Sequence, residues 1–212
     1  MRTTIGIVGY YGFVRGYPLG PELMERLRAW HWPHDVDIRE LNWGPVAIVQ
    51  DFQASAAKPD RMVLVGALDR GLVSGTVSCR RWAGGKLDAA AVQRRMFEAV
   101  TGVISLDNLL VIGTHFGIWP AETFSVELQW PESGLGDLVL GELDLGQGRV
   151  VGEGPLSADN ERAVNELLAA IRCVAVDGDG GSFAMDRLTV EALTPVAAVL
   201  HHRFVDDQGL LT

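Results

Sequence analysis

The stretch Arg61-Met-Val-Leu-Val-Gly-Ala-Leu68 decides the fold, because an unbroken run of mostly branched apolar residues predicts a strand buried on both faces. A similar run, Thr3-Thr-Ile-Gly-Ile-Val-Gly9, lies near the start of the chain. Between the two, helical periodicity over Pro21–Trp30 and Val46–Ala54 flanks an alternating segment, Val36–Leu41, which predicts a half-buried or edge strand. Strands and helices therefore alternate at the spacing of a parallel sheet with right-handed crossovers.

The rest of the chain continues this alternation. The patterns predict a strand over Gly75–Trp82, taken as an edge strand because Arg80 and Arg81 are charged, and then two helices, a strand, a helix and a final helical stretch: Ala89–Val100, Ser105–Phe116, Thr123–Trp130, Ser157–Cys173 and Leu188–Phe204. We therefore predict an α/β fold, a three-layer α/β/α sandwich around a mainly parallel sheet, of the phosphorylase/hydrolase-like type.

The composition excludes several classes of function. The 212 residues carry a net charge of −9, and the scattered basic residues argue against a nucleic-acid or anionic membrane partner. No apolar run reaches the roughly 18 residues of a membrane span. The two cysteines, Cys79 and Cys173, form no disulfide framework, so we expect a cytoplasmic protein.

Three motifs with known chemistry are incomplete in this sequence. The glycines at 6, 9 and 12 have the wrong spacing for a dinucleotide-binding loop. The segment Asp177–Gly181 starts like a calcium loop, but glycine and leucine stand where further oxygen ligands are needed. Cys79 lies beside two arginines that could lower its pKa, yet a cysteine in a strand is more often a small core residue.

The loop after the first strand is unusually aromatic. It carries Tyr10, Tyr11, Phe13 and Tyr17. Such a loop lies at the carboxyl edge of a parallel sheet, where open α/β folds bind their ligands. Clustered aromatic side chains are typical of protein interfaces, so we predict that these four residues bind a protein or peptide partner.

The order of elements resembles the nickel–iron hydrogenase maturation endopeptidases, which cut a C-terminal tail from the hydrogenase large subunit after nickel insertion. The resemblance covers residues 3–174 and is carried by five segments: Ile5–Gly9, Val36–Leu41 with Trp43-Gly44, Arg61–Ala67, Phe124–Trp130 with Pro131-Glu132-Ser133, and Leu156–Arg172. It implies an endopeptidase-like domain over residues 1–174, and we expect residues 175–212 to form a helical extension packed on that domain.

The resemblance also implies a nickel site, and this chain departs from it. The family holds nickel with an acidic residue in the first loop, an aspartate that ends the third strand, and a histidine before a later helix. The matching positions here are Gly16-Tyr17, Gly66 and the region Ala99–Ile104, and none offers the required residue type. We therefore expect a divergent member with no catalytic residues and no cofactor. Four weak substitutes could hold nickel only at displaced positions: Glu22, Asp69, Asp107 and His115. The three carboxylates are more simply interpreted as caps or solvated charges, and His115 as a residue near a helix end, where the helix dipole favours a cation.

Three functions remain open from the sequence. The leading hypothesis is a pseudoenzyme that binds a polypeptide in hydrogenase assembly, either the large subunit or an assembly factor. The first alternative is an active metal-dependent endopeptidase with displaced ligands, so whether the chain is an enzyme stays undecided. The second alternative is an α/β protein that binds a small molecule.

Overall fold

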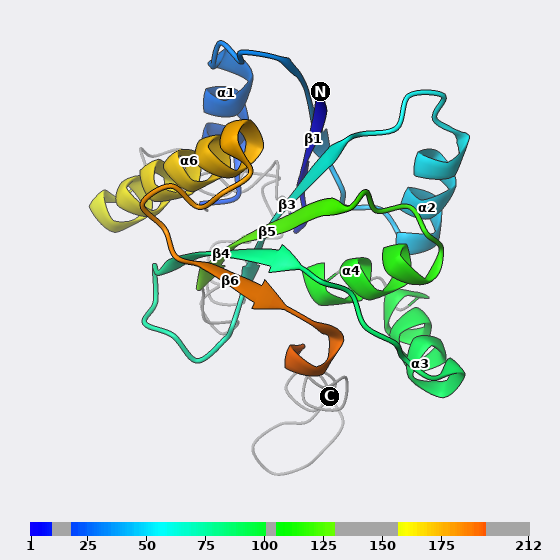
Figure 1. The fold of residues 1–212 in the computed structure, drawn as a ribbon. Coiled ribbons are helices and arrows are strands. Elements are labelled where there is room, and N and C mark those ends of the chain that lie inside the picture. Colours follow the sequence, from blue (N-terminus) through cyan, green and yellow to red (C-terminus); the bar gives the residue numbers. More distant parts are fainter. Residues whose placement is uncertain (10–17, 101–104, 130–156, 194–212) are drawn as a thin grey trace, which may run out of the picture.

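One sheet organises the molecule (Figure 1). The computed structural model describes residues 1–9, 18–100, 105–129 and 157–193, with no side chains described for 98–100. In this part of the chain the strand order is β2-β1-β3-β5-β4-β6, with bounds β1 Arg2–Ile7, β2 Asp35–Glu40, β3 Arg61–Leu68, β4 Val77–Trp82, β5 Glu122–Gln129 and β6 Met185–Leu188. The first four strands in this order run parallel, β4 is antiparallel to β5, and β6 is parallel to β4. The predicted mainly parallel sheet is confirmed.

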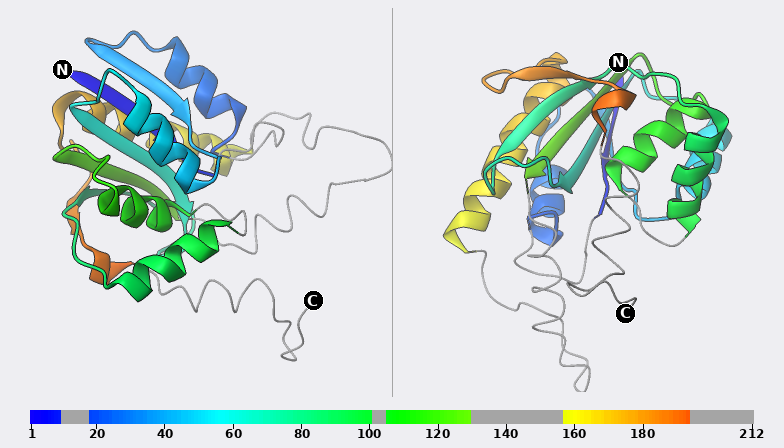
Figure 2. Two further views of the ribbon diagram at one scale, coloured as in Figure 1. Left: turned by 90° about the vertical axis from the view of Figure 1, so that its right-hand side faces the viewer. Right: turned by 90° about the horizontal axis from the view of Figure 1, so that it is seen from below.

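Helices cover both faces of the sheet (Figure 2). On one face lie α1 and α6, and on the other lie α2 and α4, with α3 packed on α4. The helix bounds are α1 Pro21–Ala29, α2 Pro45–Ala54, α3 Ala89–Val100, α4 Leu106–His115 and α6 Ala158–Asp177. The predicted three-layer α/β/α sandwich is therefore confirmed.

Alternation along the strands divides the core between the two faces. On β5, Phe124, Val126 and Leu128 join the cluster under α1 and α6. On β3, Met62 and Leu64 join the second cluster, under α2 and α4. Because neighbouring residues of a strand point to opposite faces, the polar residues between the apolar ones of β5 lie on the α4 side.

A buried arginine anchors the end of α6 to the sheet. Arg61, at the start of β3, donates through Nη1 to the carbonyl oxygens of Val174, Ala175 and Val176 at 3.3, 3.0 and 3.0 Å. These carbonyls belong to the last turn of α6. Val174 also accepts from the backbone N–H of Gly178, whereas Ala175 and Val176 lie where a helix end offers no intrahelical donor. A cation at a helix C-terminus is also favoured by the helix dipole.

Two sequence-based predictions are wrong. We expected β4 at the sheet edge, but it lies between β5 and β6, because a strand from the far end of the chain pairs with it. We expected helix from Leu188 to Phe204, but the described part of this region ends β6 at Leu188 and continues in a 3₁₀ turn, Val190–Ala192. The helical character expected of the extension after residue 174 is thus replaced by a strand over 185–188, while residues 194–212 lie outside the described residues.

Among the described residues, no helix is both long and apolar enough to cross a membrane.

Candidate functional site

The carboxyl ends of β1, β3 and β5 meet at one edge of the sheet, which is where open α/β folds bind ligands. Near this edge, β5 presents Ser125, Glu127 and Gln129 towards the α4 layer. All three are buried. Buried polar side chains need hydrogen-bond partners, so their contacts define what this edge can do chemically.

Arg70 supplies the main partner. It follows β3 directly, and its guanidinium forms a fork with Asp107 of α4, with Nη2–Oδ1 at 2.7 Å and Nη1–Oδ2 at 3.0 Å. The same guanidinium contacts Glu127, with Nε–Oε2 at 3.0 Å and Nη2–Oε1 at 3.1 Å. The side chains of Arg70, Asp107 and Glu127 are only 10%, 3% and 2% exposed. One arginine therefore bridges two buried carboxylates.

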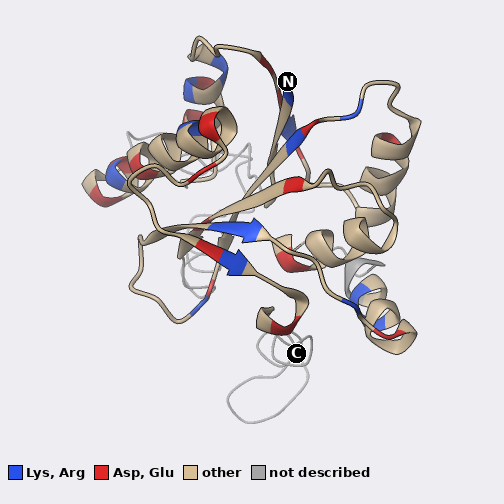
Figure 3. Cartoon of the chain, in the orientation of Figure 1, with Lys and Arg blue, Asp and Glu red and all other residues tan. Residues whose placement is uncertain are grey.

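Two further residues complete the contacts of Glu127. Arg80 of β4 donates from Nε to Oε2 at 3.1 Å, and Ser125 donates from Oγ to Oε1 at 2.8 Å. We call Arg70, Arg80, Asp107, Ser125 and Glu127 the Arg70 cluster. It contains two cations and two anions, so its formal charge is balanced. In Figure 3 the acidic first turn of α4 lies beside the basic residues of β4.

The first turn of α4 positions Asp107. Ser105 caps this helix, because its Oγ accepts from the backbone N–H of Asn108 at 3.1 Å. Asp107 then stands in the first turn, where the helix dipole favours a carboxylate. The predicted start of this helix at Ser105 is confirmed, and the Arg70 cluster ties α4 to β4, to β5 and to the loop after β3.

The electrostatics keep Arg70 charged. Burial alone would lower the pKa of Arg70, but hydrogen bonds to Asp107 and Glu127 outweigh this effect, and the pKa lies above its ordinary value. Ion pairs of this kind depend on their geometry, because removal of one partner leaves an uncompensated buried charge.

The Arg70 cluster does not fit a nickel ion. Each of the four carboxylate oxygens of Asp107 and Glu127 already accepts a hydrogen bond from Arg70. A divalent cation needs such oxygens, or imidazole nitrogens, as its own ligands. In the part of the chain that the structure describes, no group of three or more histidine, cysteine, aspartate or glutamate residues could hold a metal ion.

Gly66 lies directly beside this cluster. It pairs with Glu127 across β3 and β5. A Cβ at Gly66 would lie 2.8 Å from Cδ1 and 3.2 Å from Cβ of Leu106, the first residue of α4. At the strand position where the sequence resemblance implies an aspartate, a side chain would therefore require Leu106 to shift.

The four substitute ligands are not brought together. Asp107 is buried in the Arg70 cluster, which corrects its interpretation as a cap or solvated charge. Asp69 is exposed and accepts from Gln129 Nε2 at 2.7 Å. His115 is also exposed, at the other end of α4, about 12 Å along the helix from Asp107 at 1.5 Å per residue. Glu22 stands in the first turn of α1, and its Oε2 is buried with no hydrogen-bond partner among the described residues.

The connection from β3 to β4 crosses the carboxyl end of β5. Gln129 anchors it: Gln129 Oε1 accepts from the backbone N–H of Arg70 at 2.7 Å, and its carbonyl accepts from Gly75 at 2.9 Å. Gly71 and Gly75 adopt φ values of 70° and 83°, which favour glycine. The tip of this loop presents Leu72 and Val73, which are 43% and 81% exposed.

The predicted aromatic site lies outside the described residues. This applies to Tyr10, Tyr11, Phe13 and Tyr17, to Gly16, and to residues 101–104 of the expected histidine region. The assignment of a partner to the aromatic loop therefore stays a prediction.

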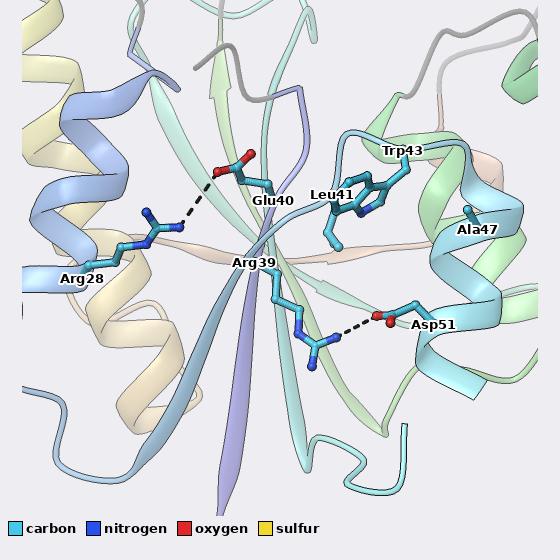
Figure 4. A pocket seen from close by; sticks show the side chains of 7 residues that line it. All are labelled: Arg28, Arg39, Glu40, Leu41, Trp43, Ala47 and Asp51. Carbon is cyan, nitrogen blue, oxygen red and sulfur yellow. Dashed lines mark hydrogen bonds and ion pairs between the residues drawn. The ribbon is translucent and has the colours of Figure 1, made fainter. Parts of the chain in front are cut away.

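A groove of about 550 Å³ lies at the carboxyl end of β2 (Figure 4). On its α1 side Arg28 faces Glu40 at 3.9 Å, and on its α2 side Arg39 contacts Asp51 at 2.9 Å. The remaining lining residues are Leu41, Trp43 and Ala47. Trp43 is 60% exposed, so this groove offers an aromatic surface between two ion pairs.

Sequence reasoning missed Arg70, Arg80 and Glu127 as site residues. The available signal was the alternation in β5, where polar residues interleave with Phe124, Val126 and Leu128 in a strand expected to be buried. Alternation alone cannot show whether the polar face of a strand is solvated or buried under a helix. The arginine that pairs with Glu127 lies 57 residues away in the sequence.

Comparisons with known proteins find similar structures only. No protein-family description matches this chain, and no curated protein sequence does. Among solved structures, the endopeptidase HycI from Escherichia coli shares 18% identity, with 90% of this chain and 99% of that chain covered and a TM-score of 0.49. The maturating endopeptidase HybD from E. coli shares 19% identity over 81% and 93% of the two chains, with a TM-score of 0.43.

A pyrrolidone carboxyl peptidase from Fervidobacterium islandicum shares 8% identity over 82% and 98% of the chains, with a TM-score of 0.41. Hydrogenase maturation endopeptidases, the family that the sequence resembles, are thus among the solved structures to which this chain is similar.

Proposed function

We propose that this chain is a non-proteolytic relative of the hydrogenase maturation endopeptidases, which binds a polypeptide partner in hydrogenase assembly. The partner is the hydrogenase large subunit or an assembly factor. The sequence resemblance supplies the biological setting of this proposal. The side chains at the carboxyl edge of the sheet supply its chemistry.

The Arg70 cluster is the observation that carries the proposal. Metal-assisted hydrolysis needs an ion with an open position for water, held by side chains that are free to coordinate it. Here two carboxylates at the edge are bound by Arg70, and Leu106 packs on Gly66. This arrangement supports a scaffold that recognises a chain without cutting it.

The partner surface in this proposal combines two loops of the same edge. The aromatic loop of residues 10–17 follows β1, and the loop with Leu72 and Val73 follows β3, which is the neighbour of β1 in the sheet. Exposed apolar side chains on an anchored loop lose little entropy when a partner covers them. We therefore assign Leu72 and Val73 to the binding surface together with Tyr10, Tyr11, Phe13 and Tyr17.

The test is capture of purified hydrogenase large-subunit precursor, and separately of its assembly factors, by the immobilised full chain. The double variant Leu72→Ser/Val73→Ser is expected to weaken capture by at least about tenfold, as truncation of central interface residues does. The matched control is Phe97→Ser, which removes a 67% exposed side chain from α3 and should leave capture unchanged. Thermal unfolding of both variants should stay close to that of the wild type.

Incubation of the captured precursor with nickel distinguishes the alternatives. The proposal expects an intact precursor on a denaturing gel. Release of the C-terminal tail would contradict it and favour an active endopeptidase with displaced ligands. Failure to capture any of these proteins would contradict the assignment of the partner.

A further inference from the structure

β2 forms one end of the sheet, and in the described part of the chain no strand pairs with its outer side. Leu41 donates its backbone N–H to Ile7 of β1 at 2.8 Å. Backbone groups of successive residues in a strand point to opposite sides, so Asp37 and Arg39 also direct theirs towards β1. Val36, Ile38 and Glu40 consequently direct their N–H and C=O groups outward, away from β1.

The side chains of this edge alternate in charge. Asp37 and Arg39 lie on the α2 side and contact each other, with Arg39 Nε–Asp37 Oδ2 at 2.5 Å. Their side chains are 32% and 29% exposed, so both remain partly accessible at this edge. Ile38, between them, lies on the α1 side and is partly buried against that core.

We propose that the outer edge of β2 binds β2 of a second copy of this chain, in antiparallel orientation, about a two-fold axis at Ile38. Edge strands are ready templates for a further strand, and a two-fold interface brings the same surface of both copies together. This inference is independent of the proposed function, because it involves neither the Arg70 cluster nor the apolar loops.

Charge complementarity selects this occupant and this register. With the axis at Ile38, Asp37 stands opposite Arg39 of the second copy, and Arg39 stands opposite its Asp37. An axis at Asp37 places Asp37 opposite itself, while Arg39 then meets Asp35. An axis at Arg39 places Arg39 opposite itself, and an axis at Val36 places Asp35 opposite Asp37. Opposite charges across a strand pair stabilise it and like charges destabilise it, so one register is favoured.

The backbone fits the same register. In an antiparallel strand pair, two opposed residues whose backbone N–H and C=O groups point at each other exchange two hydrogen bonds. With the axis at Ile38, the outward-facing residues meet as Ile38 with Ile38 and as Val36 with Glu40. Polar groups at the edge are thereby paired, and the second copy covers the groove that Trp43 lines (Figure 4).

The opposite edge of the sheet lacks this property. In β6 the charged residues Asp186 and Arg187 are adjacent, so their side chains point to opposite faces. No two-fold antiparallel register can place Asp186 opposite Arg187, because directly opposed residues have their side chains on the same face of the sheet. Of these two edges, therefore, only β2 has the self-complementary charge pattern, although β6 also carries charged residues.

Sedimentation velocity of the full chain, from about 1 to about 300 µM, covers dimers of micromolar to near-millimolar Kd. The wild type is expected to shift from 23.0 kDa towards twice that mass as the concentration rises. Asp37→Lys and Arg39→Glu each place like charges opposite one another, and each should weaken self-association at least about tenfold. The matched control, Asp186→Lys on β6, should associate like the wild type.

Mixing the two variants gives a decisive result. In the mixed dimer Lys at position 37 of one copy faces Glu at position 39 of the other, and Arg39 faces Asp37. Equimolar Asp37→Lys and Arg39→Glu should therefore form a heterodimer although neither forms a homodimer, an outcome that loss of folding cannot produce. A wild type that stays at 23.0 kDa over the whole range, or an Asp37→Lys variant that dimerises like the wild type, would overturn the inference.

Discussion

Arg70 supplies a fixed positive charge at the carboxyl edge of the sheet. It follows the central strand β3 and contacts Asp107 of α4 and Glu127 of β5, which lie 37 and 57 residues away in the sequence. A fixed guanidinium matches carboxylate geometry through its planar fork. One side chain thereby pairs with two buried acids, with Arg80 as the second cation on Glu127, and joins three elements of the fold.

Replacement of Arg70 tests this role. Arg70→Met keeps an apolar stem but removes the two hydrogen bonds that the guanidinium donates to Asp107 and the two that it donates to Glu127. Removal of one partner from a buried ion pair lowers the free energy of unfolding by about 3–5 kcal/mol. Urea denaturation measures the change. Arg94→Met, at an exposed position of α3, is the matched control and should stay within about 0.5 kcal/mol of the wild type. Equal effects of the two substitutions would contradict the role of Arg70.

Cys79 is the second residue for which the chemistry can be tested. It is fully buried under α1 and α6, and burial, with smaller contributions from Cys173 and Glu127, raises the pKa of its thiol to about 12. Because the thiolate is the reactive form, the folded protein should leave Cys79 unmodified by a thiol reagent at pH 8. Mass spectrometry after brief labelling should locate any modification at Cys173, which is partly exposed. Rapid native labelling of Cys79 would contradict this prediction.

Pairs of elements hold the two helical layers in place. On the first face, Arg26 of α1 donates to both carboxylate oxygens of Glu161 in α6, at 2.7 and 2.8 Å. On the other face, α4 lies on β3 through Leu106 and Gly66. The first contact depends on charge and the second on shape, so only the first should depend on pH.

The α1–α6 contact predicts a pH effect of defined sign. The hydrogen bond from Arg26 lowers the pKa of Glu161 below its ordinary value of 4.5. A carboxyl group with a lowered pKa in the folded state stabilises the fold above its unfolded-state pKa, and this contribution is lost as the pH falls through the folded-state value. Glu161→Gln should therefore be less stable than the wild type at pH 7, and the difference should vanish in acid.

Chemical denaturation at pH 7, 5 and 3 follows this difference. Glu25→Gln, on the exposed side of α1, is the control and should track the wild type at every pH. A difference between Glu161→Gln and the wild type that persists unchanged at pH 3 would show that shape rather than charge accounts for the contact.

The sequence predicted the elements whose signals are local. The unbroken apolar run of β3 and the start of α4 at Ser105 follow from neighbouring residues. The central position of β4 does not, since it depends on β6, about a hundred residues later. A four-residue strand such as β6 also carries too short a pattern to distinguish from helix.

The candidate site was less predictable than the fold for the same reason. Asp107 was identified as a candidate, but its partners Arg70 and Glu127 reach it only through the order of the strands. No signal in the sequence distinguishes Leu72 and Val73 from other loop residues. Their exposed placement follows from the crossing of the loop over β5, which is a tertiary feature.

The whole molecule combines an architecture that binds ligands at one edge of its sheet with a cluster of paired charges at that edge. A mainly parallel sheet between two helical layers places its loops at one edge, and in the Arg70 cluster at that edge two arginines balance two carboxylates. In the proposed function, this edge holds a guanidinium in place of a divalent cation.

The most direct test is the metal content of the full wild-type chain after equilibration with Ni²⁺, and separately with Zn²⁺, followed by desalting and elemental analysis. Because the carboxylates of Asp107 and Glu127 are committed to Arg70, the account predicts less than about 0.1 metal ion per chain. Retention of about one ion per chain would contradict it.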